Sequence, residues 1–188
     1  MGFLATLYLP ILLSSVFVFI ASSLVHMVVK WHASDYGKLP DEDKLRAAFR
    51  ASGVGPGQFV MPNCSSMKDL GSPEMKAKFQ EGPVGTLILR PAGPPSMGGA
   101  LAGWFLYTLL IGVFVAYIAS HTLRPGTPYL EVFRLTGAVA MLGYAFSYIP
   151  DSIWKGLSWS VTLKFVVDGA VYALLTAGTF GWLWPHAA

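Results

Sequence analysis

An uncharged run near the start of the chain most limits what this sequence can fold into. Residues 4–29 hold no acidic or basic side chain apart from His26. A helix that crosses the apolar core of a bilayer needs about 20 such residues. A helix also satisfies its own backbone hydrogen bonds where no water is present. The run therefore predicts a membrane-spanning helix.

Three further apolar runs follow, at 100–120, 129–149 and 159–184. Only 12% of the residues are charged, against about 25% in an average soluble domain. All six tryptophans lie at or near the ends of these runs, where amphipathic rings prefer the lipid headgroups. The sequence predicts an all-α polytopic membrane protein with four transmembrane helices. Its single cysteine excludes a disulfide framework.

The segment at 30–99 differs in composition from the four runs and carries most of the charge. Its patterns predict a small α+β insert between spans one and two. Ser72 and Pro73 suit the first positions of a helix. So little chain forms a marginal core, and we expect the insert to rest on the bundle or on a partner. In order, a helix, a strand, a helix and a strand are predicted at 41–51, 58–61, 72–81 and 84–90.

The basic residues predict the orientation. Nine Lys and Arg side chains lie in the insert, and Lys155 and Lys164 bring the number expected on that side to eleven. The opposite side has only Arg124 and Arg134. Cytoplasmic loops carry an excess of Lys and Arg. We therefore expect residues 30–99 to be cytoplasmic and both termini to lie outside.

Lys164, Asp168 and Tyr172 form a polar stripe on the predicted fourth span. Residues four apart lie on one face of a helix, and ionisable groups inside a span are costly and often functional. Three interpretations remain open. Asp168 could be an ion or proton site, the stripe could fix helix packing, or Lys164 could reach the interface and pair with Asp168 one turn deeper.

His26, near the cytoplasmic end of the first span, is the side chain best placed to ligate haem or the magnesium of a chlorophyll. A b-type haem normally takes two histidines, and we expect no second histidine at a matching depth. A hydrogen-bonding role at the interface is therefore favoured, and neither a cofactor nor a metal is predicted. The spacing of His32 and Asp35 suits a metal only with ligands from elsewhere.

Small residues recur every four positions on two of the spans. Such stripes let helix backbones approach closely in lipid. They serve either packing within the chain or contact with another subunit. On the second span they are Gly112, Ala116 and Ser120, and on the fourth they are Gly169, Ala173, Ala177 and Gly181.

Three stretches of the chain resemble a family of uncharacterised bacterial inner-membrane proteins of this length. They are LPILLSSVFVFIASSLVHMVVKWHASDY at 9–36, PPSMG at 94–98 and DGAVYALLTAGTFGWLWP at 168–185. The resemblance implies a bacterial source, but the family has no established activity and so implies no site residues. A small multi-span chain of this kind is also similar to accessory subunits of photosynthetic or respiratory complexes.

The sequence lacks the motifs of familiar enzyme classes: a phosphate-binding glycine loop, HExxH and GxSxG are absent. Its basic residues alternate with acids, which gives nucleic-acid binding no support. The leading hypothesis is a non-catalytic accessory subunit of a larger inner-membrane complex, in contact with lipid and with other subunits or itself. The alternatives are a small homo-oligomeric transporter or channel using Asp168, and a cofactor- or lipid-handling enzyme using His26.

Overall fold

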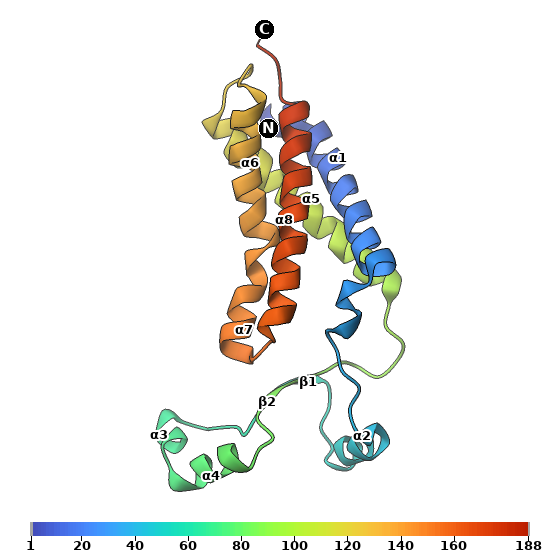
Figure 1. Cartoon of the computed structure of the whole chain (residues 1–188), viewed down its shortest axis with the longest axis vertical. Coiled ribbons are helices and arrows are strands. Elements are labelled where there is room, and N and C mark those ends of the chain that lie inside the picture. The colour runs from blue at the N-terminus through green and yellow to red at the C-terminus, as the bar shows by residue number, and fades with distance from the viewer. Residues whose placement is uncertain (1, 188) are drawn as a thin grey trace.

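The computed structural model describes residues 2–187. In that range, four helices are long and apolar enough to cross a membrane, which agrees with the predicted fold class. They form an elongated bundle, with the insert hanging from one end and both termini at the other (Figure 1). The four apolar helices are Gly2–Val29, Met97–Thr122, Tyr129–Lys155 and Trp159–Trp182.

The first helix changes its winding before it ends. Helix α1 spans Gly2–Leu24 and is kinked ahead of Pro10, which has no N–H to donate to the preceding turn. Its continuation, η1 (Val25–Val29), is a π-helical turn, a form found frequently at functional sites. Lys30 then adopts a left-handed conformation with φ 55° and ends the helix. A single 3₁₀ turn, η2 (Trp31–Ser34), follows.

The insert contains the predicted elements and one more. The strands pair antiparallel, with Phe59 opposite Leu87. The additional element is a one-turn helix whose cap, the Ser66 hydroxyl, accepts the N–H of Asp69 at 3.2 Å. The elements are α2 (Glu42–Ala51), β1 (Gly57–Met61), α3 (Met67–Leu70), α4 (Pro73–Glu81) and β2 (Gly85–Leu89).

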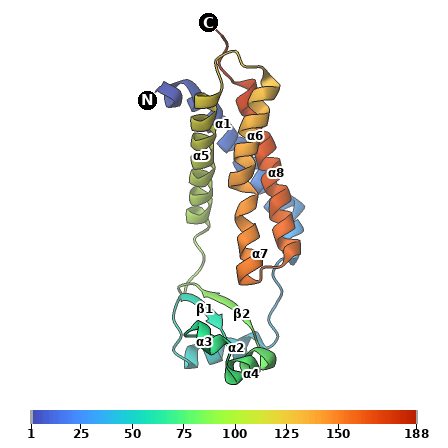
Figure 2. The ribbon, with the colours of Figure 1, turned by 90° about the vertical axis from the view of Figure 1, so that its left-hand side faces the viewer.

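The insert has no core of its own. Every residue at positions 36–99 is exposed or only half-buried. Figure 2 shows the insert below the bundle, joined to it by two extended links. This agrees with the expectation of a marginal core.

The third apolar helix is longer and less regular than the predicted 129–149. It runs on to Lys155, but the winding changes around Phe146. Pro150 lies in the first turn after the change and cannot donate a hydrogen bond to the carbonyl of Phe146. The bundle helices of the second half are α5 (Met97–Thr122), α6 (Tyr129–Tyr144), η3 (Phe146–Tyr148), α7 (Ile149–Lys155) and α8 (Trp159–Trp182).

The stripe of small residues on α8 lies against α6. A Cβ added to Gly169 would come within 2.5 Å of the Ala145 Cα, and one at Gly181 within 2.7 Å of the Tyr129 ring. Ala173 and Ala177, between these glycines, are buried. The α8 stripe therefore serves packing within the chain.

The stripe on α5 lies mostly against α1. A Cβ at Gly112 would meet the Ile11 side chain at 3.3 Å and its backbone at 3.4 Å. Ala116 is fully buried, whereas Ser120 is only half-buried and donates a hydrogen bond to the Tyr117 carbonyl. The α1–α5 pair leans away from the α6–α8 pair toward the insert end (Figure 1).

Candidate binding site at the insert end of the bundle

A cavity of about 1100 Å³ lies in the bundle near the insert. Residues of α1, α5, α6, α7 and α8, together with η1 and η3, line it. Its walls are mostly apolar and aromatic, and its polar residues include His26, Asp168 and Tyr172. Apolar wall residues include Phe19, Met27, Leu101, Trp104 and Phe165.

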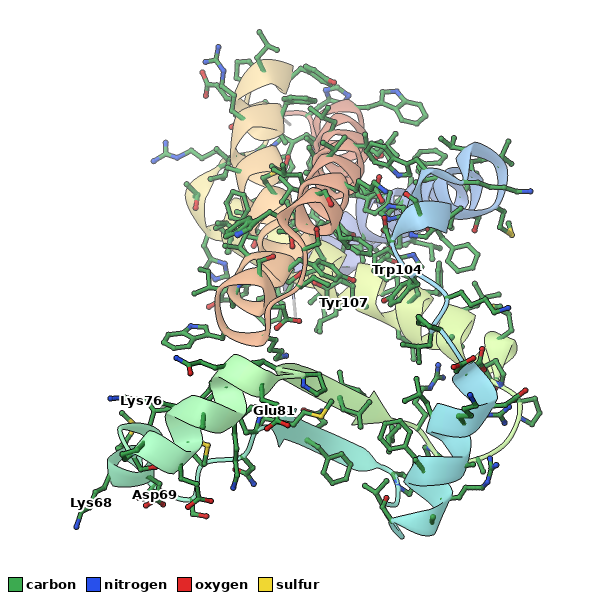
Figure 3. All side chains as sticks on the ribbon, turned by 60° about the horizontal axis from the view of Figure 1, so that its bottom comes forward. Lys68, Asp69, Lys76, Glu81, Trp104 and Tyr107 are labelled. Carbon is green, nitrogen blue, oxygen red and sulfur yellow. The ribbon has the colours of Figure 1, made fainter. Side chains whose placement is uncertain are left out.

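Aromatic rings from α5, α6 and α8 form one wall. Trp104 and Tyr107 lie on the side of α5 that faces α6 and α8 (Figure 3). The Trp104 ring is 5.9 Å from Tyr172, and the Tyr107 ring is 6.2 Å from Tyr144. The Trp104 Nε1 donates to the Ser22 hydroxyl at 2.8 Å, so the wall is fixed to α1 as well.

Four side chains, hereafter the polar chain, connect α8 with the segment that follows α1. Lys164 Nζ is 2.5 Å from Asp35 Oδ1, and Asp35 Oδ2 is 2.5 Å from His32 Nδ1. His32 Nε2 in turn lies 2.7 Å from Asp168 Oδ2. Of the three interpretations of the stripe, the direct pairing of Lys164 with Asp168 is wrong, because Lys164 contacts Asp35 and Asp168 contacts His32.

The turn after α1 brings these residues to α8. The left-handed Lys30 ends the helix, and the single turn of η2 places His32 and Asp35 on the side toward α8. Lys164 Nζ also donates to the Trp31 carbonyl at 2.8 Å and to the Ser34 hydroxyl at 3.1 Å. Lys164 therefore fastens the whole turn to α8.

Asp35 is the central acid of the polar chain. Its side chain is only 3% exposed, and burial by itself raises the pKa of a carboxyl group. The hydrogen bonds and charges of Lys164 and His32 outweigh that effect, so the pKa of Asp35 is lowered from its usual value of 3.8. Asp35 is therefore an ionised acceptor at neutral pH.

His26 and His32 lie side by side. Their rings are stacked with centroids 4.8 Å apart and an angle of 4° between the planes. The expectation that no second histidine reaches the depth of His26 is therefore wrong. The cause is the left-handed residue Lys30, which ends the helix and which the sequence pattern of an uninterrupted helix does not indicate. The Nδ1 of His26 faces the Ser22 carbonyl at 2.9 Å.

The hydroxyl group of Tyr172 is buried without a hydrogen-bond partner in the described part of the chain. The residue is 4% exposed and lines the cavity. A buried polar group that lacks a partner costs about 1–3 kcal/mol. This hydroxyl is therefore placed to bond to a molecule in the cavity.

The structure thus brings together four of the residues that the sequence singled out: His26, Lys164, Asp168 and Tyr172. Sequence reasoning gave only a weak role to His32 and Asp35, although their spacing was noted, and it did not single out Trp104. The partners of Asp35 are distant in sequence, so no local pattern indicated them. No protein-family model, curated protein or solved structure matches this chain.

Proposed function

We propose that this chain is an integral protein of a bacterial inner membrane that binds an amphipathic, lipid-like molecule between its long helices. The cavity of about 1100 Å³ carries the proposal. Its volume exceeds the roughly 300–1,000 Å³ of common ligand pockets, and its walls suit a long apolar chain. Polar groups gather where His26, Asp168 and Tyr172 line it.

The ligand would place its apolar chain against Phe19, Leu101 and Trp104, and its polar head near Tyr172. A carbonyl oxygen only accepts hydrogen bonds, so the contact with Ser22 places the proton of a neutral His26 on Nδ1. Nε2 of His26 is then an acceptor, and the Tyr172 hydroxyl can donate or accept. A small hydrogen-bonding head on a long apolar chain fits this arrangement.

The test is to measure what the purified protein carries. The full chain, extracted in mild detergent and washed, is treated with organic solvent, and the extract is analysed by mass spectrometry and absorption. We expect a lipid-like molecule at a constant ratio to protein. A phospholipid and an isoprenoid quinone differ in mass and in ultraviolet absorption, so the two sources are distinguished.

A cavity-filling variant gives the test its control. Ser23 lines the cavity, and its hydroxyl donates to a carbonyl of its own helix. Ser120 makes the same kind of bond near the far end of α5 and lies outside this cavity. Ser23→Trp should lower the bound ligand severalfold, and Ser120→Trp should leave it unchanged. Equal amounts of bound ligand in the two variants would contradict the proposal.

A second function, subunit of a larger inner-membrane complex, is supported by the insert. Its α2 helix presents Leu45 and Phe49 on one face, yet no residue at 36–99 is buried. A partner's cytoplasmic surface would cover this face. Extraction from native membranes, followed by size analysis and mass spectrometry, should give a large peak with partners in fixed ratio. A small peak of this chain alone would contradict this function.

A further inference from the structure

We infer that His26, His32 and Asp168 form a binding site for a divalent transition-metal ion of the zinc type. One nitrogen from each histidine and one oxygen of Asp168 all lie within 4.8 Å of one another. This inference goes beyond the proposed function, because three protein ligands hold an ion whether or not the cavity contains a lipid.

Two of the three ligand atoms, from His32 and Asp168, have a spacing near that of a metal site, and the third, from His26, lies within 4.8 Å of them. In a tetrahedral zinc site with bonds of about 2.0–2.2 Å, neighbouring ligand atoms are about 3.3 Å apart. His32 Nε2 and Asp168 Oδ2, at 2.7 Å, need to separate only slightly. His26 borders the cavity and is not enclosed, so its side chain is free to rotate toward the ion.

In each histidine, a hydrogen bond at Nδ1 leaves Nε2 as the nitrogen that can bind a metal. Metal-bound histidines almost always donate their second ring N–H to a carbonyl or a carboxylate. Here Nδ1 of His26 faces the Ser22 carbonyl at 2.9 Å, and Nδ1 of His32 faces Asp35. Both histidines therefore leave Nε2 for an ion. Nε2 of His32 already faces Asp168, whereas the His26 ring is stacked parallel on His32 and has to turn before its Nε2 points to the same place. Lys164 holds Asp35 in turn.

The contact between His32 and Asp168 is the one that a bound ion would replace. His32 Nε2 and Asp168 Oδ2 are hydrogen-bonded to each other at 2.7 Å. A metal ion bound by both atoms would take the place of this hydrogen bond, and metal binding at such sites generally releases protons.

The side of the site facing the cavity would remain open. His26 and Asp168 both border the cavity, so water or a ligand's head group can reach the ion from there. Many reactive zinc and iron sites are held by two histidines and one carboxylate and keep one coordination position open. The stacked rings present their nitrogens side by side, whereas the axial ligands of a haem approach from opposite faces. A single ion can be bound by both histidines once the His26 ring has turned out of the stack.

The experiment uses the full chain purified without a histidine tag, stripped with chelator and titrated with Co²⁺ and Zn²⁺ in detergent. Co²⁺ reports its ligands through visible absorption bands. We expect one equivalent of Co²⁺ to bind, with bands that Zn²⁺ displaces. No bound equivalent at micromolar metal would overturn the inference.

Variants identify the ligands. His26→Ala and Asp168→Asn should each weaken Co²⁺ binding roughly tenfold or more, since loss of even an outer partner weakens metal sites by about 10–100-fold. Asp168→Asn keeps the shape of the side chain, and its size-exclusion profile checks the fold. The matched control is His121→Ala, because His121 Nδ1 also faces a carbonyl four residues back, that of Tyr117 at 2.7 Å. His121 belongs to no such ligand group within residues 2–187.

The outcomes separate this inference from the lipid proposal. Binding that persists in both site variants, or that is lost only in His121→Ala, would overturn the metal site. The lipid content of chelator-treated protein is measured in parallel. Lipid without metal binding would contradict the metal site alone, and metal binding without lipid would contradict the lipid proposal alone.

Discussion

Single residues show why the local pair predicted on α8 does not form. An exposed pair four apart on a helix contributes only about 0.2–0.5 kcal/mol, whereas a hydrogen bond to a charged group contributes about 1.5–3 kcal/mol. Lys164 makes three contacts with the turn after α1, and Asp168 contacts His32. The distant partners are therefore favoured over the near one.

Removing the charge of Asp35 should loosen this junction. In Asp35→Asn, Lys164 loses its buried partner, and we expect the free energy of unfolding to fall by about 2 kcal/mol. The measurement is thermal unfolding of the metal-free protein in detergent at neutral pH. Asp41→Asn is the control, because the Asp41 side chain is 73% exposed. Equal unfolding temperatures for the two variants would contradict the role given to Asp35.

Pairs of helices depend on the small residues between them. The spacing on α8 predicted a close contact, and the structure shows that its partner is α6 within the same chain. At Gly169 the neighbour is the backbone of Ala145, within 2.5 Å of an added Cβ, so the neighbour cannot yield by a side-chain rotation.

Gly169→Ala should therefore force α8 away from the end of α6. Overpacking of this kind lowers stability by about 1–3 kcal/mol, and thermal unfolding in detergent measures it. Gly103→Ala on α5 is the control, because a Cβ there meets nothing within 4 Å and alanine favours a helix. The expected order of stability is Gly103→Ala at or above the native chain, and Gly169→Ala below it. The reverse order would rule out the packing described.

The elements of the insert should open far more readily than the bundle, because segments with few buried contacts unfold locally at little cost. Brief trypsin treatment of the purified protein should cut at exposed sites such as Lys68 and Lys76, which lie far from the bundle (Figure 3). The two large fragments should stay together on size exclusion. Early cuts at Arg134, which lies inside α6, would show that the bundle opens first.

Over the whole molecule, the features of interest divide between the two ends of the bundle. The insert, the cavity and the turn between α7 and α8 all lie at one end, and both termini lie at the other (Figures 1 and 2). Four successive helices that alternate in direction place both termini at the same end.

The single cysteine, Cys64, tests the orientation. It lies half-buried in the insert, so a membrane-impermeant maleimide should label it in inverted vesicles and not in intact cells. Cys64→Ser combined with His186→Cys moves the thiol to the opposite end and should reverse the pattern. Labelling of Cys64 in intact cells would place the insert outside.

The sequence alone determined the four apolar helices and most elements of the insert. These features follow from local rules: the length of an apolar run, the spacing of small residues, and a cap such as Ser72. It also indicated His26, Lys164, Asp168 and Tyr172 as unusual residues. Only the tertiary structure decided which side chains they meet. Lys164 and Asp35 are 129 positions apart, and Asp168 and His32 are 136 apart. Spacing along a helix relates residues three or four apart, so the break at one left-handed residue, Lys30, formed a site that no local pattern contains.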